Sequence, residues 1–385
     1  MSENKRIKSL EGLRFYLVVT VVFSHMGFMR VSNTGNWLMD HFFMNGGYAV
    51  SYFFILSGFG SALGYTNLFK KIYKENYLNY IGRRIKKIYL PYVVAMCYIL
   101  IYQFLNWDKS VAFSIRFFET LFKIALGASM TQAWTWSDYT VIGNTPTWFM
   151  SCQMFIYLLS PFFLHFIGKI AVDIKKNMLI IYVCLIAEII IMHSVYKNET
   201  VGLATNILYW TPLVRVFEFI IGMCSAYIYI KLSRKDLNKI WLYCIDLAAF
   251  TVLVVSYFLT LMIGRDKLFV HEQYVQLIHI ITFPCVIMGF ALADNVGVFA
   301  NFFANKFNSY LGRISMFVYI IHYDIIHCGG RELSTKLSEV YKHGLWLGIA
   351  IILIITMVMA ILYDIYNRKK VNRRITVTNS NVDGQ

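Results

Sequence analysis

The sequence predicts an all-α protein that crosses a membrane about ten times, with both termini in the cytoplasm. Hydrophobic residues make up 58% of the 385 residues and charged residues only 15%, and the mean hydropathy is +0.55. These values are far from those of a soluble domain. The apolar residues gather in runs of roughly 17–25, the length that an α-helix needs to cross a bilayer.

Ten such runs follow one another along the chain. They cover residues 12–30, 46–66, 87–106, 147–168, 178–194, 207–231, 241–263, 274–293, 309–328 and 344–366. The stretch 110–130 differs, because Arg116, Glu119 and Lys123 recur among Phe and Leu at spacings of three and four. This pattern indicates an amphipathic interfacial or re-entrant helix.

Lysine and arginine are distributed unevenly between the two sides of these runs. With the N-terminus inside, most of the 36 basic residues fall in inner segments, which include residues 70–74, 83–87 and 368–374. Cytoplasmic loops carry such an excess, so the pattern predicts a multi-pass protein of the inner or plasma membrane. The net charge of +15 is then explained by this bias and by anionic lipid headgroups, without a nucleic acid partner.

The chain reads as one membrane domain, residues 1–366, followed by a short basic tail, residues 367–385, whose composition predicts disorder. The first run is too long for a cleavable signal peptide and lacks a small-residue cleavage site. All seven cysteines lie in apolar runs with no C-x-x-C pair. We interpret them as packing residues, and neither a disulfide framework nor a metal site is indicated.

Two ionisable residues interrupt the first run. Arg14 and His25 are separated by ten residues, and at about 100° and 1.5 Å per residue they share one helix face, roughly 16 Å apart along the axis. Ionisable groups inside a membrane are costly, and they usually mark a path for a substrate, an ion or a proton.

Five further segments accompany this R-x10-H pair. They are FFILSGF (53–59), YIGRRIKKIYLPY (80–92), TPTWFMSCQMFIYLLSP (145–161), RVFEFIIGM (215–223) and LGRISMFVYIIHYDII (311–326). Together and in this order they resemble acyltransferase family 3, a family of integral membrane acyltransferases, over residues 5–370. One common form of the family has a glutamate five or six residues after the tryptophan, where this chain has Gln153 and Met154. The segment is similar instead to a variant with W-F-L followed by Y-L-x-x-P, so a carboxylate on this helix is not expected to be catalytic.

The resemblance implies transfer of an acyl group, usually acetyl, from cytoplasmic acetyl-CoA to a carbohydrate hydroxyl at the outer face. Acyl-CoA would be a co-substrate, with no permanently bound cofactor, and polysaccharide-assembly proteins are possible partners. Arg14, Arg83 and Arg84, with Lys86 and Lys87 nearby, would hold the phosphates of coenzyme A. An extended pantetheine arm is about as long as the distance from Arg14 to His25. A buried, neutral His25 would remove the acceptor's proton or carry the acyl group as a nucleophile, and the sequence leaves both roles open.

Each candidate residue also has a structural interpretation. His25 could be a hydrogen-bond partner within the bundle, and Arg83 and Arg84 could be positive-inside anchors. Trp148 could belong to an interfacial aromatic belt or to the wall of an acceptor site, and His322 and Asp324 could line that same site. Packing is the preferred role of Ser57, Gly58 and Phe59, and an internal i,i+3 ion pair that of Arg215 and Glu218.

A transporter would also line a polar pathway with such residues. The paired arginines at the cytoplasmic side, and the lack of repeated halves or paired broken helices, favour the acyltransferase. A non-catalytic scaffold would leave the aligned intramembrane charges unexplained.

Overall fold

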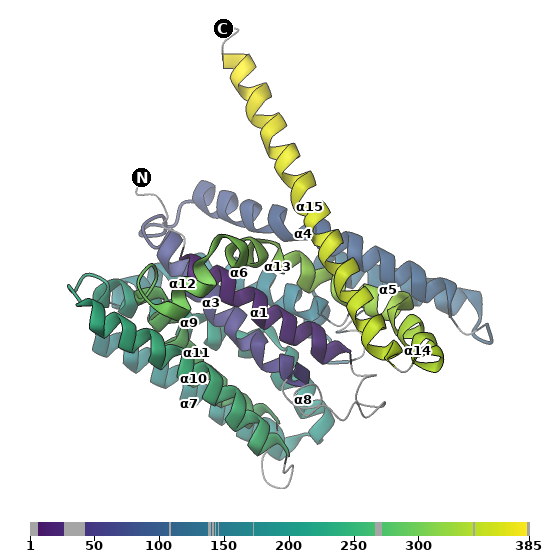
Figure 1. The fold of residues 1–385 in the computed structure, drawn as a ribbon, viewed down its shortest axis with the longest axis horizontal. Coiled ribbons are helices and arrows are strands. Elements are labelled where there is room, and N and C mark those ends of the chain that lie inside the picture. The colour runs from purple at the N-terminus through teal and green to yellow at the C-terminus, as the bar shows by residue number, and fades with distance from the viewer. Residues whose placement is uncertain are drawn as a thin grey trace.

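The computed structural model describes residues 7–26, 43–107, 109–137, 140, 142, 144, 146–171, 173–265, 272–341 and 343–382. Within these ranges the chain is helical and contains no strand, which confirms the predicted all-α class. The helices, in chain order, are α1 (Lys8–His25), η2 (Phe43–Tyr48), α3 (Ala49–Tyr65), α4 (Lys74–Leu105), α5 (Phe113–Ser129), η3 (Gln132–Trp134), α6 (Thr147–Ile170), α7 (Ile174–Asn198), α8 (Val201–Trp210), α9 (Pro212–Leu232), α10 (Lys239–Arg265), α11 (Glu272–Leu292), α12 (Val298–Ala304), α13 (Lys306–Ile325), the π-helical turn η5 (Ile326–Gly330), α14 (Arg331–Val340) and α15 (Gly344–Val382). Figure 1 shows their arrangement as one bundle from which α15 extends.

Eight helical segments of the described chain are long and apolar enough to cross a membrane, and all eight lie on predicted runs. They are Gly46–Tyr65, Lys74–Leu105, Thr147–Ile170, Ile174–Asn198, Pro212–Leu232, Lys239–Ile263, Tyr274–Leu292 and Gly344–Lys369. The other two runs form α1 and α13, which are more polar because they contain Lys8, Glu11, Arg14, Lys306, Arg313 and Asp324. Residues 27–30 of the first run lie outside the described residues. The chain is thus a polytopic membrane protein, and the count of ten spans and the cytoplasmic termini stay predictions.

Helices α1 and α13 approach each other closely at a glycine. A Cβ atom on Gly312 would lie 1.9 Å from the backbone oxygen of Glu11, a distance that no larger residue tolerates. Gly12 makes an equally close approach to α12, where a Cβ atom would lie 2.0 Å from the oxygen of Phe303. Because the backbones meet here, side chains on α1 can reach carbonyl oxygens of α13.

Helices α3 and α9 cross in the same way. A Cβ atom on Gly58 would lie 1.9 Å from the oxygen of Phe219, and one on Gly222 would lie 1.9 Å from the oxygen of Ile55. The backbones of α3 and α9 therefore approach each other closely at Gly58 and Gly222. This crossing brings the polar side chains of both helices into the middle of the bundle.

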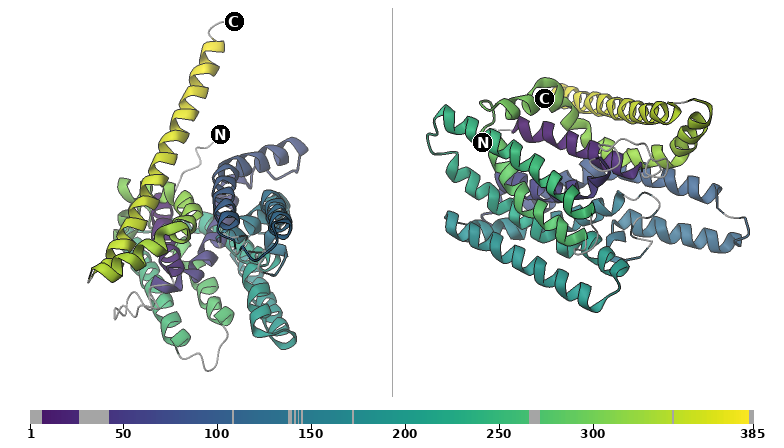
Figure 2. Two further views of the ribbon diagram at one scale, coloured as in Figure 1. Left: turned by 90° about the vertical axis from the view of Figure 1, so that its right-hand side faces the viewer. Right: turned by 60° about the horizontal axis from the view of Figure 1, so that its bottom comes forward.

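Helix α5 covers the stretch for which the sequence predicts an interfacial or re-entrant helix. It runs beside α4, where Tyr92 Oη donates to the oxygen of Gly127 at 2.9 Å, and the two form the hairpin that projects in Figure 2. Lys123 and Glu119 pair at 2.9 Å, as their spacing of four predicts. At 17 residues, α5 is not one of the candidate spans.

The basic tail continues α15 as a helix through Val382, although the composition predicts disorder there. No glycine or proline interrupts the chain between Gly348 and Gly384, so no residue in this stretch ends the helix that begins in the apolar segment. The division of the chain at residue 366 stays a prediction.

Candidate functional site

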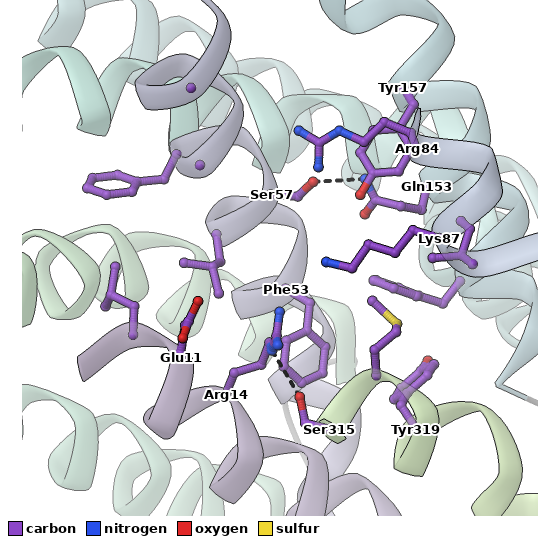
Figure 3. A pocket seen from close by; sticks show the side chains of 18 of the residues that line it. Glu11, Arg14, Phe53, Ser57, Arg84, Lys87, Gln153, Tyr157, Ser315 and Tyr319 are labelled. Carbon is purple, nitrogen blue, oxygen red and sulfur yellow. Dashed lines mark hydrogen bonds between the residues drawn. The ribbon is translucent and has the colours of Figure 1, made fainter. Parts of the chain in front are cut away.

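The first cavity has a volume of about 520 Å³ and lies among α1, α3, α4, α6 and α13. Figure 3 shows Arg14 of α1 and Arg84 and Lys87 of α4 directed toward this space. Its other polar lining residues include Glu11, Ser57, Gln153, Tyr157 and Ser315. The volume lies within the range of small-molecule and cofactor sites, and the excess of cations suits an anionic ligand.

Arg14 is held by α13. Its Nε donates to Ser315 Oγ at 2.9 Å, and Nη2 donates to the backbone oxygen of Gly312. The close approach of α1 and α13 at Gly312 makes these bonds possible. The guanidinium is thereby fixed at the edge of the cavity and has further N–H groups for a ligand.

Arg84 is stacked among three tyrosines of α3, α4 and α6. Its guanidinium carbon lies 5.1 Å from the ring centre of Tyr65, 5.2 Å from that of Tyr80 and 4.7 Å from that of Tyr157. One Nη also donates to Ser61 Oγ at 3.2 Å. Such cation–π contacts hold the guanidinium without neutralising its charge.

Arg83 is placed differently from its neighbour. Its side chain is exposed, and Nε donates to the oxygen of Asn79 on its own helix at 3.3 Å. Lys87, three residues after Arg84 and on the same face, lines the cavity instead. The structure therefore brings Arg14, Arg84 and Lys87 together and leaves Arg83 outside the cavity.

The second cavity has a volume of about 210 Å³ and contains His25. Its walls come from α1, η2, α3, α6, α8 and α13, with Trp148, Tyr209 and Trp210 as its large aromatic residues. Tyr319 lines both cavities. Its ring lies 5.3 Å from that of Phe149 and 6.1 Å from that of Phe53, both of which line the first cavity.

His25 lies against a second histidine. Its Nδ1 is 3.0 Å from Nε2 of His322, and Nδ1 of His322 is 3.1 Å from the backbone oxygen of Val318. His322 is fully buried. It contacts His25 but does not line either cavity.

Asp324 faces another partner. Its Oδ1 accepts a hydrogen bond of 2.7 Å from Asn144 Nδ2, which also donates to the oxygen of Ile320 at 3.1 Å. Asp324 therefore ties the loop before α6 to α13, and it does not line either cavity.

The wall of the second cavity is braced by a buried ion pair. Arg215 Nη1 donates to Glu218 Oε1, and both side chains are at most 1% exposed, as the i,i+3 spacing predicts. Arg215 also donates to the oxygen of Tyr209 at 2.9 and 2.7 Å and lies 5.6 Å from the ring centre of Trp148. The pair thus holds two of the aromatic walls in place.

The SGF segment contributes to the first cavity as well as to packing. Ser57 and Phe59 both line it, and Ser57 Oγ accepts a hydrogen bond of 2.9 Å from Gln153 Nε2. Gly58 lies on the opposite face, against α9. Gln153, one of the two residues at which one common form of acyltransferase family 3 would have its glutamate, thus lines the cavity.

Sequence reasoning missed the face of α13 that unites the site. Gly312, Ser315, Tyr319 and His322 follow one another at spacings of three, four and three, so they share one side of the helix. They contact Glu11, Arg14, the two cavities and His25 in turn. This spacing was the signal that could have identified Ser315 and Tyr319.

A family model described as an acyltransferase domain matches residues 7–365. The chain is also 27% identical over 246 residues to "Acyltransferase MdmB" of Streptomyces mycarofaciens, and the match covers 58% of this chain and 57% of that protein. The matched part is thus little more than half of that relative. No solved structure matches the chain. Since the family model covers nearly all of the sequence and both cavities lie inside the matched range, the chain belongs to acyltransferase family 3.

Proposed function

We propose that this protein transfers an acyl group, most simply acetyl, from cytoplasmic acyl-CoA to a hydroxyl of a carbohydrate on the other side of the membrane. The observation that carries the proposal is the meeting of two cavities at Tyr319. One cavity presents cations to a donor, and the other presents His25 to an acceptor. The charge bias of the loops supports a cytoplasmic position for the donor cavity.

The first cavity suits the phosphates of coenzyme A. Arg14, Arg84 and Lys87 face one space, and charge-assisted hydrogen bonds from guanidinium groups are among the strongest that proteins make to phosphate. Both guanidiniums are already held by protein partners, so little side-chain freedom is lost when the donor binds. The pantetheine arm would then follow α1 from Arg14 toward Tyr319 and His25.

The second cavity suits a polar acceptor with an apolar face. Trp148, Tyr209 and Trp210 offer amphipathic rings, which bind apolar surface and keep a polar edge for hydrogen bonds. A sugar ring has both kinds of surface. The Arg215–Glu218 pair keeps these walls in place before the acceptor binds.

The proposed reaction uses His25 as a general base. The acceptor oxygen attacks the thioester carbonyl carbon while its proton passes to His25. The carbon–sulfur bond then breaks, and the coenzyme A thiolate takes the proton back from His25. If His25 is instead a covalent carrier, the acyl group rests on the ring nitrogen between two such transfers.

Purified protein in lipid nanodiscs tests this proposal. Radiolabelled acetyl-CoA should bind with saturation, and excess unlabelled coenzyme A should compete. In cells, mass spectrometry of surface polysaccharide should find acyl groups with the wild-type protein and none with the His25→Ala variant. Substrate uptake by the wild-type protein without any acylated glycan would contradict the proposal and support the transporter.

A further inference from the structure

The contact between His25 and His322 has a direction that the backbone determines. The oxygen of Val318 can only accept a hydrogen bond, and it lies 3.1 Å from His322 Nδ1. Nδ1 of His322 must therefore carry a hydrogen. In a neutral ring this leaves a lone pair on Nε2 of His322.

The lone pair on Nε2 of His322 in turn determines where the neutral His25 ring carries its hydrogen. Nε2 of His322 lies 3.0 Å from Nδ1 of His25, and one hydrogen has to stand between these two nitrogens. Since Nε2 of His322 is an acceptor, Nδ1 of His25 is the donor. The neutral His25 ring then has its lone pair on Nε2, the nitrogen that does not contact His322, and His25 lines the second cavity.

We propose that His322 is a positioning residue that holds His25 in the tautomer with a basic Nε2, using the carbonyl of Val318 as the fixed end of the chain. This inference rests on the proposed function, because a base or a nucleophile at His25 needs that lone pair in either mechanism. When Nε2 accepts the acceptor's proton, Nδ1–H donates from a cationic ring to His322, and this charge-assisted bond strengthens. His322 thus supports His25 before and during proton transfer.

The surroundings keep this geometry. The ring of Tyr323 stands edge-on to His25 with ring centres 5.5 Å apart, and Asn144 fastens the same turn of α13 through Ile320 and Asp324. Because His322 is fully buried, no solvent competes for its Nε2.

Two similar amides separate positioning from packing. Glutamine at residue 322 places its amide where Nε2 of histidine lies, so His322→Gln can still accept from His25. Asparagine reaches only the position of Nδ1, so His322→Asn keeps a polar group near Val318 and loses the acceptor for His25. We expect His322→Gln to keep kcat within about threefold of wild type. His322→Asn and His322→Leu should lose about 10- to 100-fold in kcat, with KM for acetyl-CoA unchanged.

A spectroscopic measurement reads the tautomer directly. Wild-type protein labelled with ¹⁵N-histidine in nanodiscs should show His25 with hydrogen on Nδ1 and none on Nε2, assigned by comparison with His25→Ala. His322→Leu should shift this ring toward the other tautomer. A wild-type His25 with its hydrogen on Nε2 would overturn the inference, as would a folded His322→Gln no more active than His322→Asn. The spectrum needs no turnover, so a protein with the expected tautomer but no acyl transfer would contradict only the proposed function.

Discussion

Tyr319 packs against Phe149 with ring centres 5.3 Å apart, and Tyr319 is the lining residue that the two cavities share. The contact is therefore a partition between the cationic cavity and the cavity that contains His25.

Removing the ring of Tyr319 should increase the hydrolysis of acetyl-CoA by water. In Tyr319→Ala the two cavities should merge, and water should reach the thioester, so that hydrolysis of acetyl-CoA without acceptor rises while transfer falls. Tyr319→Phe should behave like wild type, since the hydroxyl makes only a long bond of 3.5 Å to the oxygen of Pro146. Release of free coenzyme A in the absence of acceptor measures the effect. Equal release by the Ala and Phe variants would show that the ring is no partition.

Arg84 and its neighbour form a matched pair. Arg84→Gln should weaken acetyl-CoA binding about 10- to 100-fold, the cost of losing charge-assisted bonds of roughly 1.5–3 kcal/mol. Arg83 is exposed and bonds its own helix, so Arg83→Gln should change affinity less than about twofold, as expected of a screened surface charge. Calorimetric titration with coenzyme A compares them. Equal losses in both variants would return Arg84 to the role of a topological anchor.

His25→Ala should abolish acyl transfer but leave donor binding largely intact. A general base contributes about 10² to 10⁴ in rate, whereas the phosphate contacts lie roughly 16 Å away along α1. The control is His279→Gln, which changes another buried histidine, one bonded to Thr260 at 2.7 Å and lining neither cavity. Both variants should be assayed for binding and transfer on the same preparations. Acyl transfer by His25→Ala at a rate near that of the wild type would contradict the proposed mechanism.

The crossing of α3 and α9 should not tolerate a side chain. Gly58→Ala places a Cβ atom within 1.9 Å of the oxygen of Phe219, so the helices have to separate, and the melting temperature should fall by several degrees. Gly82→Ala meets nothing within 4 Å and should stabilise α4 by up to about 1 kcal/mol, as helix propensity predicts. Thermal unfolding in detergent compares the two. A Gly58→Ala protein as stable as Gly82→Ala would show that the crossing is loose.

Reporter fusions test the membrane orientation. The excess of basic residues on one side predicts that a reporter after Gln385 faces the cytoplasm and one inserted near Ser137 faces the exterior. Glycosylation or phosphatase reporters at both sites give the answer. Both reporters on the same side would mean that the number of spans is wrong.

Much of the fold follows from local sequence, because long apolar runs have few alternatives to spanning helices. The ion pair between Arg215 and Glu218 also follows from local sequence, because an i,i+3 spacing places both groups on one face of a helix. The distinction between Arg83 and Arg84 does not, because both carry the same charge, and only the tyrosines of α3 and α6 select Arg84. Likewise, no local sequence pattern around His25 predicts its contact with His322.

Contacts of the site join α1 to α13 across almost the whole chain, since Arg14 and Ser315 are 301 positions apart and His25 and His322 are 297 apart. The chain is synthesised from its N-terminus, so α1 is made long before α13. Neither contact can form until almost the whole protein has been synthesised. A chain interrupted before α13 has neither the complete donor site nor the partner of His25. Under the proposed function, acyl transfer therefore starts only after α13 has joined α1, and unfinished chains do not consume acyl-CoA.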